Sequence, residues 1–555
     1  MFLLLLALPA LSAANLVTAA APLVKLNYGV FQGVTDGNLS TFLGIPFAQP
    51  AYAMRFESPK VPVLAEGLQN ATAFGAACPQ QAQSSVPLDP FAAAPYPAIS
   101  EDCLTLNVFK PASLNPQSKL PVFVWIYGGG FEFGNSADTD VRPVVERSIV
   151  LDEPIIIVTP NYRLSAFGFL AGKEVGDAGI SNLGLRDRET WGFDIGQKFA
   201  LEWIQAHISA FGGDPERVVI GGPSAGAISV GILLLTNNRF EQSSLFRGAF
   251  MLSGSPTTSG SLADGQPDYD GLVEANNCTQ ANDTLECLRR VPFEDFMATV
   301  NHTTNLNSYS SLNNIWRPRV DGDVVLQNPL ISVMKGLYAK LPIMTGDSDD
   351  EGTVFSLSNT NITTNDEFLG YVHSNYLPGS TAAQIVNISQ LYPDDPTQGA
   401  PFNTGTANEL TPEFKRLAAF QGDYTFIGAR RFFLERASTT QDAWSWCAHE
   451  SEQTPESTPV FGAFHGSDLP IWFLTENATD PRGVDAMVNF INTLDPNRAS
   501  SPNKMNSAIC WPKWNTPSPN GSTSLMLFSD PDLANVASED FRVDAIQFLY
   551  ELLLE

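Results

Sequence analysis

The sequence predicts an α/β protein with a large, mostly parallel central sheet that is flanked by helices and carries surface insertions. Strand-like and helix-like segments alternate through most of the 555 residues, which is the pattern of an α/β fold. Several strand-like segments are continuous apolar runs, as expected of parallel strands buried on both faces. Hydrophobic residues make up 44% of the chain and include 36 Phe, so a sizeable core can form.

The domain organisation follows from the same alternation. Length alone favours three or four domains, at about 150 residues each, but no segment has the composition of a linker. We therefore expect residues 21–555 to form a single domain. Residues 1–20 resemble a secretory signal peptide, because a short apolar run is followed by small residues, with candidate cleavage after Ala13 or Ala20. The expected location is extracellular.

Charge and composition agree with export. Charged residues are only 16% of the chain, and the formal net charge is −28. This charge argues against nucleic acid or an anionic membrane as a partner, because phosphate surfaces would repel it. We expect no stable membrane anchor, since no stretch is long and apolar enough to span a bilayer. N-glycans are expected at sequons, which begin at Asn38, Asn70, Asn277, Asn282, Asn301, Asn361, Asn387, Asn477 and Asn520.

Six cysteines in an exported chain favour disulfides, with 15 possible pairings. Cys278 and Cys287 are close in sequence and isolated from the rest, so we expect them to pair. Cys447 and Cys510 stay open, either as a disulfide or as two buried thiols. No C-x-x-C or H-x-x-x-H spacing indicates a metal site, and no cofactor is expected.

The expected elements follow the chain. Residues 24–60 alternate apolar and polar side chains around glycines, which predicts antiparallel strands and hairpins. Apolar runs predict strands of the central sheet at 121–127, 154–158, 218–220, 249–252, 341–345, 443–448 and 524–528. Helices are expected at 197–203, after residue 225 and at 543–554. We interpret 188–196 as an insertion, 260–335 as a less regular surface insertion, and 392–412, 451–460 and 494–522 as long polar loops.

The motif G-x-S-x-G occurs once, at residues 222–226, between a β-branched run and a segment of small residues. Strand, tight turn and helix in this order form a nucleophile elbow, in which the serine Oγ stands clear of the backbone. Gly222 and Gly226 have no Cβ to clash with the neighbouring elements. Ser224 is therefore the candidate nucleophile, and the alternative is an ordinary turn.

A nucleophilic serine needs a base, and the base needs an orienting acid. In an elbow of this kind the acid and then the histidine follow the serine along the chain. Of the five histidines, His207 precedes the serine and shares a helical stripe with Trp203 and Phe211, so we expect it to be a half-buried core residue. His302 lies within a sequon, and we expect it to be exposed. His373, His449 and His465 complete the set.

The acid has several candidates by position. Asp347, Asp349, Asp350 and Glu351 all follow the predicted strand at 341–345, and spacing cannot choose among them. Upstream, a glycine triplet at 128–130 ends the apolar run at 121–127. Backbone N–H groups of Gly129 and Gly130, together with that of Ala225, would form an oxyanion hole, because no side chain keeps a substrate away from the glycines.

Two further motifs carry a family resemblance. The segment T-F-L-G-I-P-F-A at 41–48 with R-F at 55–56, and the segment E-D-C-L-T-L-N-V at 101–108, resemble signatures of the type-B carboxylesterase/lipase family, which includes cholinesterases and fungal lipases. The resemblance covers most of the mature chain and implies the α/β-hydrolase fold. It also implies an ion pair between Arg55 and Glu101 and a disulfide between Cys78 and Cys103.

The resemblance assigns the remaining catalytic roles. The segment D-E-G-T at 350–353 matches the family's acid motif and places the acid at Glu351, so we expect Asp347, Asp349 and Asp350 to be surface charges. The segment G-A-F-H-G-S-D-L at 462–469 resembles the family's histidine loop and places the base at His465. The implied function is a secreted serine hydrolase of small carboxylic esters, which acts through an acyl-enzyme with a Ser-His-Glu triad.

The sequence also departs from the family pattern. Pro223 stands where the family usually has Glu, and the proline-rich segment 79–102 lacks the period of an amphipathic lid helix. We therefore favour an esterase of soluble or moderately apolar esters. An interfacial lipase or sterol esterase is the alternative. A catalytically inactive adhesion-type homologue is less favoured, because no triad residue is missing. The oligomeric state stays open.

Overall fold

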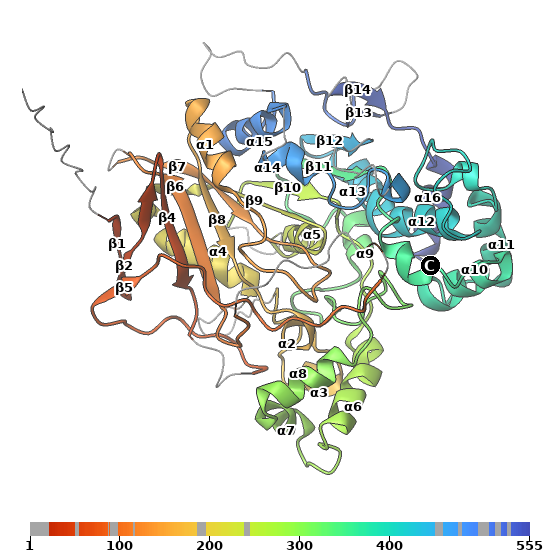
Figure 1. Cartoon of the computed structure of the whole chain (residues 1–555), viewed down its shortest axis with the longest axis horizontal. Coiled ribbons are helices and arrows are strands. Elements are labelled where there is room, and N and C mark those ends of the chain that lie inside the picture. The colour runs from red at the N-terminus through yellow and green to blue at the C-terminus, as the bar shows by residue number, and fades with distance from the viewer. Residues whose placement is uncertain are drawn as a thin grey trace, which may run out of the picture.

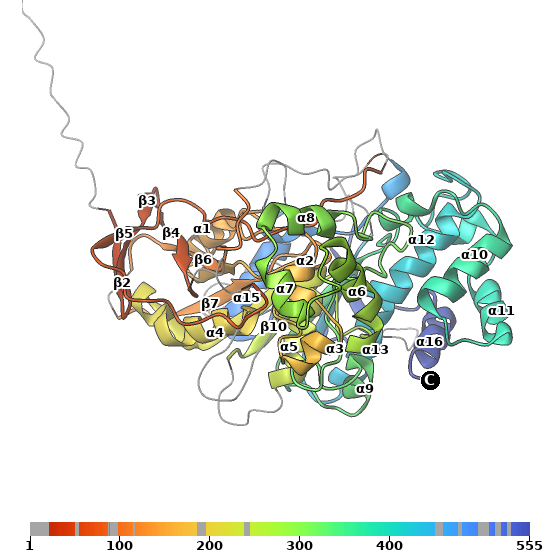
Figure 2. The same cartoon turned by 90° about the horizontal axis from the view of Figure 1, so that it is seen from below.

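The computed structural model describes residues 21–49, 55–86, 88, 98–114, 117–185, 196–237, 245–449, 459–474, 480–497, 510–516, 523–529 and 534–555. The predicted signal peptide (1–20) lies outside the described residues. The same holds for 188–195 of the predicted insertion and for the sequons at Asn477 and Asn520. Figures 1 and 2 show the chain in two perpendicular views.

A large mixed sheet occupies the centre of the molecule (Figure 1). Within the described residues it contains β3 (Val34–Asp36), β4 (Leu39–Pro46), β6 (Thr105–Pro111), β7 (Leu120–Trp125), β8 (Ile156–Pro160), β9 (Gly213–Pro223), β10 (Gly248–Leu252), β11 (Ile343–Ser348), β12 (Ala443–Ala448), β13 (Ser524–Phe528) and β14 (Asn535–Ser538). Their order is β14-β13-β12-β11-β10-β9-β7-β8-β6-β4-β3. The seven strands β13, β12, β11, β10, β9, β7 and β8 are parallel to one another. Antiparallel strands continue the sheet at both ends, with β14 beside β13 and with β6, β4 and β3 beyond β8.

The predicted apolar runs form the central strands because both faces of the sheet are covered. Every residue of β10 and β12 is buried. Along β7, Val122 and Val124 belong to one hydrophobic cluster, whereas Phe123 and Trp125 belong to another. This alternation is the two-residue period of a strand between two apolar layers. All seven predicted strands of the central sheet are confirmed, with shifts of a few residues at some ends.

Helices cover both faces. α1 (Arg142–Val150), α14 (Leu469–Phe473) and α15 (Arg482–Thr493) share a hydrophobic cluster with Phe123 and Trp125. On the other face, α4 (Gly196–His207) and α5 (Ala225–Asn237) pack with Val122 and Val124. The helices predicted at 197–203 and after residue 225 are α4 and α5. This arrangement confirms the predicted α/β class.

The remaining elements surround this core. β1 (Leu23–Leu26) and β2 (Gly29–Gln32) are antiparallel, as predicted, and β5 (Leu68–Asn70) extends them to a small sheet. The other helices are α2 (Ser165–Phe169), α3 (Lys173–Asp177), η2 (Ile208–Phe211), η3 (Leu262–Gly265), α6 (Gln266–Ala275), α7 (Thr284–Arg290), α8 (Phe293–Asn301), α9 (Pro329–Met334), η4 (Phe355–Asn359), α10 (Asn365–Tyr371), η5 (Val372–Tyr376), α11 (Ala382–Leu391), η6 (Pro396–Gln398), α12 (Phe414–Gly422), η7 (Asp423–Ile427), α13 (Gly428–Ala437), η8 (Pro459–Phe461) and α16 (Val543–Leu552).

The segment 260–335 is more regular than predicted. It forms η3, α6, α7, α8 and α9, and the helices α6–α8 lie below the sheet in Figure 1. These helices have ten residues or fewer, which is too short for a clear periodic signal. Local caps define their ends: the Asp283 carboxylate accepts the Glu286 N–H at 2.8 Å at the start of α7, and Asn328 caps α9.

Two disulfides are present. Cys278 bonds Cys287, and Cys78 bonds Cys103, which confirms both expected pairs. Cys447 and Cys510 are not bonded to each other. Cys447 is a buried thiol and Cys510 is an exposed one, so neither expected alternative, a disulfide or two buried thiols, describes the pair.

The expected ion pair between Arg55 and Glu101 is also present, with 2.6 Å between Arg55 Nη2 and Glu101 Oε1. Arg55 Nη1 donates to the Val291 carbonyl at 2.8 Å, and the guanidinium lies 5.0 Å from the ring centre of Phe296. The pair therefore joins the N-terminal part of the chain to the turn between α7 and α8. Among the described residues, no helix has the length and hydropathy needed to cross a bilayer.

Candidate active site

Ser224 lies at the turn between β9 and α5. Its φ is +53°, a left-handed conformation that costs a residue with a Cβ about 1–3 kcal/mol. Two backbone contacts hold the turn: the Ser224 N–H donates to the Leu252 carbonyl at 2.8 Å, and the Ser224 carbonyl accepts the Ile228 N–H at 2.9 Å. The first contact joins the turn to the end of β10, and the second begins α5. The structure therefore has the strand–turn–helix geometry of a nucleophile elbow.

The glycines of the motif are required by close backbone approach. A Cβ at Gly222 would lie 2.2 Å from the Ile126 carbonyl oxygen, and a Cβ at Gly226 would lie 2.0 Å from it. A Cβ at Gly128 would lie 3.1 Å from Ser224 Cβ. The turn therefore packs directly against the end of β7, and the glycine triplet that follows β7 lies beside Ser224.

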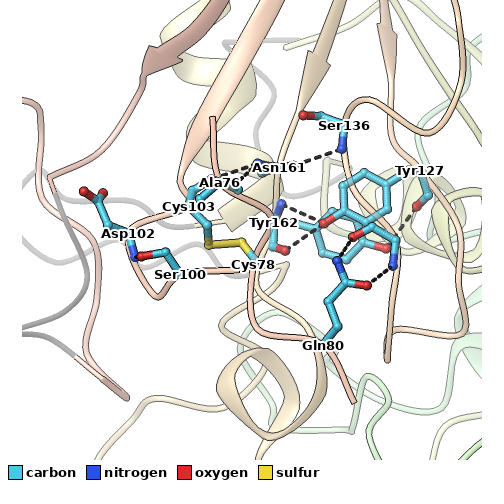
Figure 3. Close-up of a disulfide and its surroundings, with 11 residues drawn as sticks. Ala76, Cys78, Gln80, Ser100, Asp102, Cys103, Tyr127, Ser136, Asn161 and Tyr162 are labelled. Atoms are coloured by element: carbon cyan, nitrogen blue, oxygen red, sulfur yellow. Dashed lines mark hydrogen bonds between the residues drawn. A yellow bond between two sulfur atoms is a disulfide. The ribbon is translucent and has the colours of Figure 1, made fainter. Parts of the chain in front are cut away.

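The disulfide loop supports the glycine loop of residues 128–134 (Figure 3). The Gln80 side chain makes two hydrogen bonds with the backbone of Gly134, donating to its carbonyl and accepting its N–H, both at 3.0 Å. Gln80 follows Cys78 by two residues. Across the disulfide, the Asn161 amide donates to the Cys103 carbonyl at 3.0 Å. The disulfide thus joins the segment that carries Gln80 to the end of β8.

Glu351 and His465 are in direct contact. Glu351 follows β11 and is completely buried. Its Oε1 accepts the Ser348 N–H at 2.7 Å and the Ser253 hydroxyl at 2.6 Å, and its Oε2 bonds His465 Nδ1. Since Nδ1 bonds the carboxylate, Nε2 is the nitrogen that can exchange a proton with a nucleophile.

Aromatic side chains enclose His465, which is only 5% exposed. Its ring centre lies 5.0 Å from that of Phe355 and 4.5 Å from that of Phe426. Three residues further on, Asp468 accepts the indole N–H groups of Trp446 and Trp472 at 3.2 and 3.4 Å. Burial raises the pKa of Asp468 to about 6, and the charge of Glu351 adds to the rise.

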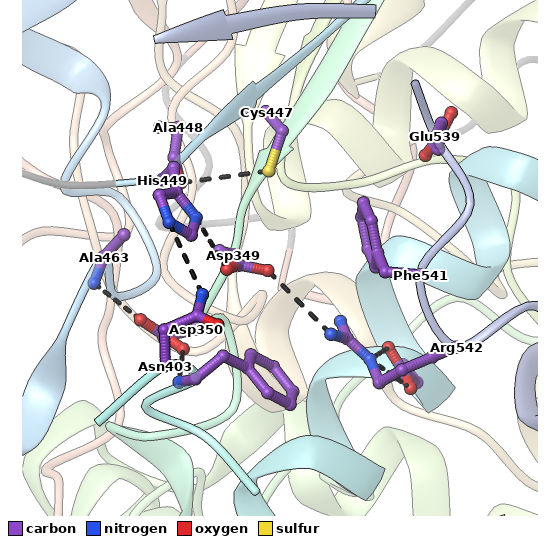
Figure 4. Close-up of polar contacts among 12 residues, drawn as sticks. Asp349, Asp350, Asn403, Cys447, Ala448, His449, Ala463, Glu539, Phe541 and Arg542 are labelled. Carbon is purple, nitrogen blue, oxygen red and sulfur yellow. Dashed lines mark hydrogen bonds and ion pairs between the residues drawn. The ribbon is translucent and has the colours of Figure 1, made fainter. Parts of the chain in front are cut away.

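The prediction that Asp347, Asp349 and Asp350 are surface charges is wrong, because all three are buried. Asp347 bonds Arg430 Nε at 2.6 Å. Asp349 Oδ2 bonds His449 Nδ1 at 2.9 Å, as Figure 4 shows. β11 continues to Ser348, and segments far along the chain cover its end. The sequence around 347–351 contains no signal for that cover.

Asp350 connects the acid turn to the histidine loop (Figure 4). Its Oδ2 accepts the Ala463 N–H at 2.9 Å, and its Oδ1 accepts the Phe402 N–H at 2.7 Å. A Cβ at Gly462 would lie 2.1 Å from Asp350 Oδ2. Burial and the charge of Asp349 raise the pKa of Asp350 well above its ordinary value. Asp350 thereby holds the backbone two residues before His465.

Sequence reasoning missed the contribution of Ser253. This residue directly follows the predicted strand at 249–252, so its position at the carboxyl end of a parallel strand was a signal that could have found it. β10 lies between β9 and β11. Ser253 therefore lies between the elbow, which bonds Leu252, and the Glu351 carboxylate. The aromatic contacts of His465 had no comparable signal.

The other histidines lie in different surroundings. His207 is half-buried, with ring centres of Tyr28 and Trp203 at 5.7 and 5.2 Å, and burial lowers its pKa. It is a core residue, as predicted. His302 is exposed, also as predicted. Within the described residues, no cluster of three or more His, Cys, Asp or Glu side chains could hold a metal ion.

A serine elbow at the carboxyl edge of a parallel sheet with helices on both faces defines the class of protein: the chain has the α/β-hydrolase fold. Comparison with solved structures agrees. Aspergillus niger EstA superposes with a TM-score of 0.80 at 27% sequence identity, over 96% of this chain and 99% of that one.

Comparison of sequences gives the family. The model of the carboxylesterase family matches residues 20–530. A secreted triacylglycerol lipase of Gibberella zeae is 37% identical, over 96% of this chain and 90% of the relative. Secreted lipase 1 of Botryotinia fuckeliana is 36% identical over 97% and 93% of the two chains, and lipase 4 of Diutina rugosa is 35% identical over 92% of each. The chain belongs to the carboxylesterase family and is a secreted carboxylic ester hydrolase.

Proposed function

We propose that Ser224, His465 and Glu351 form the catalytic triad of this hydrolase. The observation that carries the proposal is the bond from the buried Glu351 carboxylate to His465 Nδ1, at the same edge of the sheet as the serine elbow. A hydrogen-bonded, buried acid orients the imidazole and stabilises its protonated form during the reaction. The left-handed φ of Ser224 supports its role as the nucleophile.

We further propose Gly129, Gly130 and Ala225 as the donors of the oxyanion hole. The proximity of the glycine loop to Ser224 supports this role. Ala225 is the first residue of α5, so no intrahelical acceptor is available to its N–H. Loss of one such donor costs about 10²–10³ in turnover in serine hydrolases.

The proposed reaction is acyl transfer. Ser224 Oγ attacks the ester carbonyl while His465 accepts the hydroxyl proton, and the N–H donors stabilise the negative oxygen of the tetrahedral intermediate. His465 then donates the proton to the leaving alcohol as the C–O bond breaks. Water hydrolyses the acyl-enzyme by the same steps, and His465 again serves first as base and then as acid.

Pro223 precedes the nucleophile. Its backbone stays in β9 and pairs with Leu252 of β10, so the elbow forms without the Glu that the family usually has. Because a carboxylate is missing at this position, we expect the electrostatic field around His465 to depend on Glu351 and on the buried Asp468. The proposed N–H donor of Ala225 is unaffected.

Two substrate classes remain candidates. The sequence favours soluble or moderately apolar esters, because the segment 79–102 lacks the period of a lid helix. The relatives favour acylglycerols, because several are named lipases. Initial rates measured across the solubility limit of a medium-chain ester distinguish the two classes. A jump above the limit identifies an interfacial lipase, and saturation below it identifies an esterase.

Residues 1–20 are proposed as a signal peptide and 21–555 as one mature domain. N-glycosylation is also proposed. The sequons in the described residues support it, since all of them have an exposed asparagine: Asn38, Asn70, Asn277, Asn282, Asn301, Asn361 and Asn387.

The decisive test of the triad uses Ser224→Ala. We expect this variant to lose hydrolysis of p-nitrophenyl butyrate by at least about 10³-fold, because it lacks the nucleophile, and to keep its melting temperature. An organophosphonate should label the wild type at Ser224 and leave the variant unlabelled. Wild-type protein that neither hydrolyses esters nor reacts with the phosphonate would refute the proposal.

A further inference from the structure

Three consecutive residues of the glycine loop have a left-handed backbone conformation. The φ angles of Gly129, Gly130 and Phe131 are +95°, +62° and +65°. The left-handed region is open to glycine, but it is strained for Phe131 because of its Cβ. Hydrogen bonds within the loop and from neighbouring segments must therefore keep it in this shape.

One peptide of the loop decides the direction of a proposed oxyanion donor. The Gly129 carbonyl accepts the N–H groups of Glu132 and Phe133 at 3.0 and 3.1 Å. In a planar trans peptide the C=O of Gly129 and the N–H of Gly130 point in opposite directions. The bonds that fix this carbonyl therefore also fix the Gly130 N–H.

Glu132 belongs to this turn, and its side chain is hydrogen-bonded by two other segments of the chain. Its side chain is completely buried. Oε2 accepts the Leu306 N–H at 2.8 Å and the Gln83 amide at 3.1 Å. Asn314, from the same segment as Leu306, donates to the Gly130 carbonyl at 2.5 Å. Gln83 of segment 80–84 and Leu306 of segment 305–314 thus both bind the Glu132 carboxylate, and Asn314 binds the backbone of the same loop.

We infer that Glu132 is a positioning residue for the oxyanion hole. Its backbone N–H holds the Gly129–Gly130 peptide, and its side chain anchors the loop to Leu306 and Gln83. Burying a carboxylate is costly, and only Oε2 of Glu132 is hydrogen-bonded, because the buried Oε1 accepts no hydrogen bond from the described residues. The two bonds to Oε2 are charge-assisted, and such bonds are stronger and shorter than neutral ones. The ionised side chain therefore restrains the loop more firmly than a neutral side chain of the same size. The inference rests on the proposed role of Gly129 and Gly130.

The protonation state of Glu132 links the loop to pH. Burial raises the pKa of Glu132 to about 7, and the Leu306 N–H and the amides of Gln83 and Asn314 oppose the rise because they favour the ionised form. These uncharged donors are the groups that face the carboxyl from the segments around it, and among the described residues no charged side chain contributes to the shift. Protonation below neutral pH therefore weakens the anchor.

The test compares wild type with Glu132→Gln, which keeps the size of the side chain and one acceptor but has no ionisable proton. We expect kcat for p-nitrophenyl butyrate to fall about 10- to 100-fold, less than for loss of a whole donor, with KM within twofold of wild type. A trifluoromethyl ketone, whose adduct carries an oxyanion, should bind more weakly by the same factor as kcat/KM falls.

The pH profile separates positioning from a merely structural role. In the wild type, protonation of Glu132 adds one proton to those that lower activity on the acid side of the profile. In Glu132→Gln this proton is absent, so the acid limb of log kcat/KM against pH should be less steep than in the wild type. Gln83→Met removes one donor to the Glu132 carboxylate, so it should raise the pKa of Glu132 and move the acid limb to higher pH. This second variant keeps the test valid if Glu132→Gln does not fold.

The matched control is Glu153→Gln, since Glu153 is also buried and its backbone carbonyl bonds Asn492 of α15. This control should keep the wild-type slope. Wild-type kcat and slope in Glu132→Gln would overturn the inference, and so would a fall in kcat with an unchanged slope and a lower melting temperature. Wild-type enzyme that hydrolyses no ester would instead refute the proposed function.

Discussion

The Glu351 carboxylate receives hydrogen bonds on both oxygens. Ser253 and the Ser348 N–H donate to Oε1, and His465 bonds Oε2. Glu351→Gln replaces one acceptor oxygen with an NH₂ group. When the new NH₂ group faces His465, Nδ1 of the ring must accept a hydrogen bond from it, so the proton of the neutral ring sits on Nε2. Nε2 can then no longer accept the proton of the nucleophile. We expect kcat to fall about 10³–10⁴-fold, with the melting temperature changed little.

Steady-state kinetics with p-nitrophenyl butyrate and thermal unfolding measure the effect. The matched control is Glu413→Gln, because Glu413 is also a buried carboxylate but bonds Arg416 at 3.0 Å. Activity of Glu351→Gln within tenfold of wild type would assign the orienting acid to another residue.

Single residues of the site were predictable to different degrees. The tight turn at Ser224 and the glycines around it were predictable from local sequence, because the turn itself demands small residues. Asp350 was misassigned as a surface charge. Its environment consists of the Phe402 and Ala463 N–H groups, which come from segments 52 and 113 residues away along the chain. No local pattern reports such partners.

At the scale of elements, the two disulfides differ in what they hold. Cys78–Cys103 closes a separation of 25 residues beside Gln80, which bonds the glycine loop. Cys278–Cys287 closes a separation of nine residues and joins the turn after α6 to α7 itself. From loop-closure entropy we expect removal of the first pair by Cys→Ser to cost about 3.5 kcal/mol and removal of the second about 2.5 kcal/mol.

The two variants should separate in activity as well. Loss of Cys78–Cys103 loosens the support of the proposed oxyanion donors, so kcat should fall severalfold at a temperature where the protein is still folded. Loss of Cys278–Cys287 should leave kcat near wild type. Denaturant unfolding and initial rates check both expectations. An equal fall in kcat for both variants would show that the first disulfide stabilises the fold without positioning the loop.

The secondary elements were predicted well where burial imposes a strong pattern. Strands covered on both faces need continuous apolar residues, and such runs are visible without a structure. The helices within 260–335 are short and defined by caps such as Asp283, and they are stabilised by packing on their neighbours. Their periodic signal is weak for that reason, and the prediction of a less regular insertion was wrong.

For the molecule as a whole, buried carboxyls predict a stability that depends on pH. Burial raises the pKa of Glu132 to about 7 and the pKa values of Asp138 and Asp468 to about 6. The unfolded chain releases these protons near pH 4. Between pH 4 and 7 the folded state therefore binds more protons than the unfolded state, and the free energy of unfolding falls as pH rises. Burial lowers the pKa of His207, so this residue acts against the trend.

We expect the melting temperature to be higher at pH 5 than at pH 8. The net charge of −28 acts in the same direction, because self-repulsion grows as acidic groups ionise. Differential scanning calorimetry across this range measures the effect, and Asp468→Asn should flatten the curve. A melting temperature that rises steadily from pH 5 to pH 8 would contradict the linkage.

The order of motifs along the chain was sufficient to indicate the class of fold, the candidate nucleophile and, through the family resemblance, the histidine and the acid. Those features depend on local rules, because a tight turn needs glycine and a buried strand needs apolar residues. The roles of Ser253, Asp350 and Glu132 depend on contacts between segments that are far apart in sequence. Burial, hydrogen bonding and pKa at such positions are set by what folds over them, so they emerge only when the chain is assembled in three dimensions.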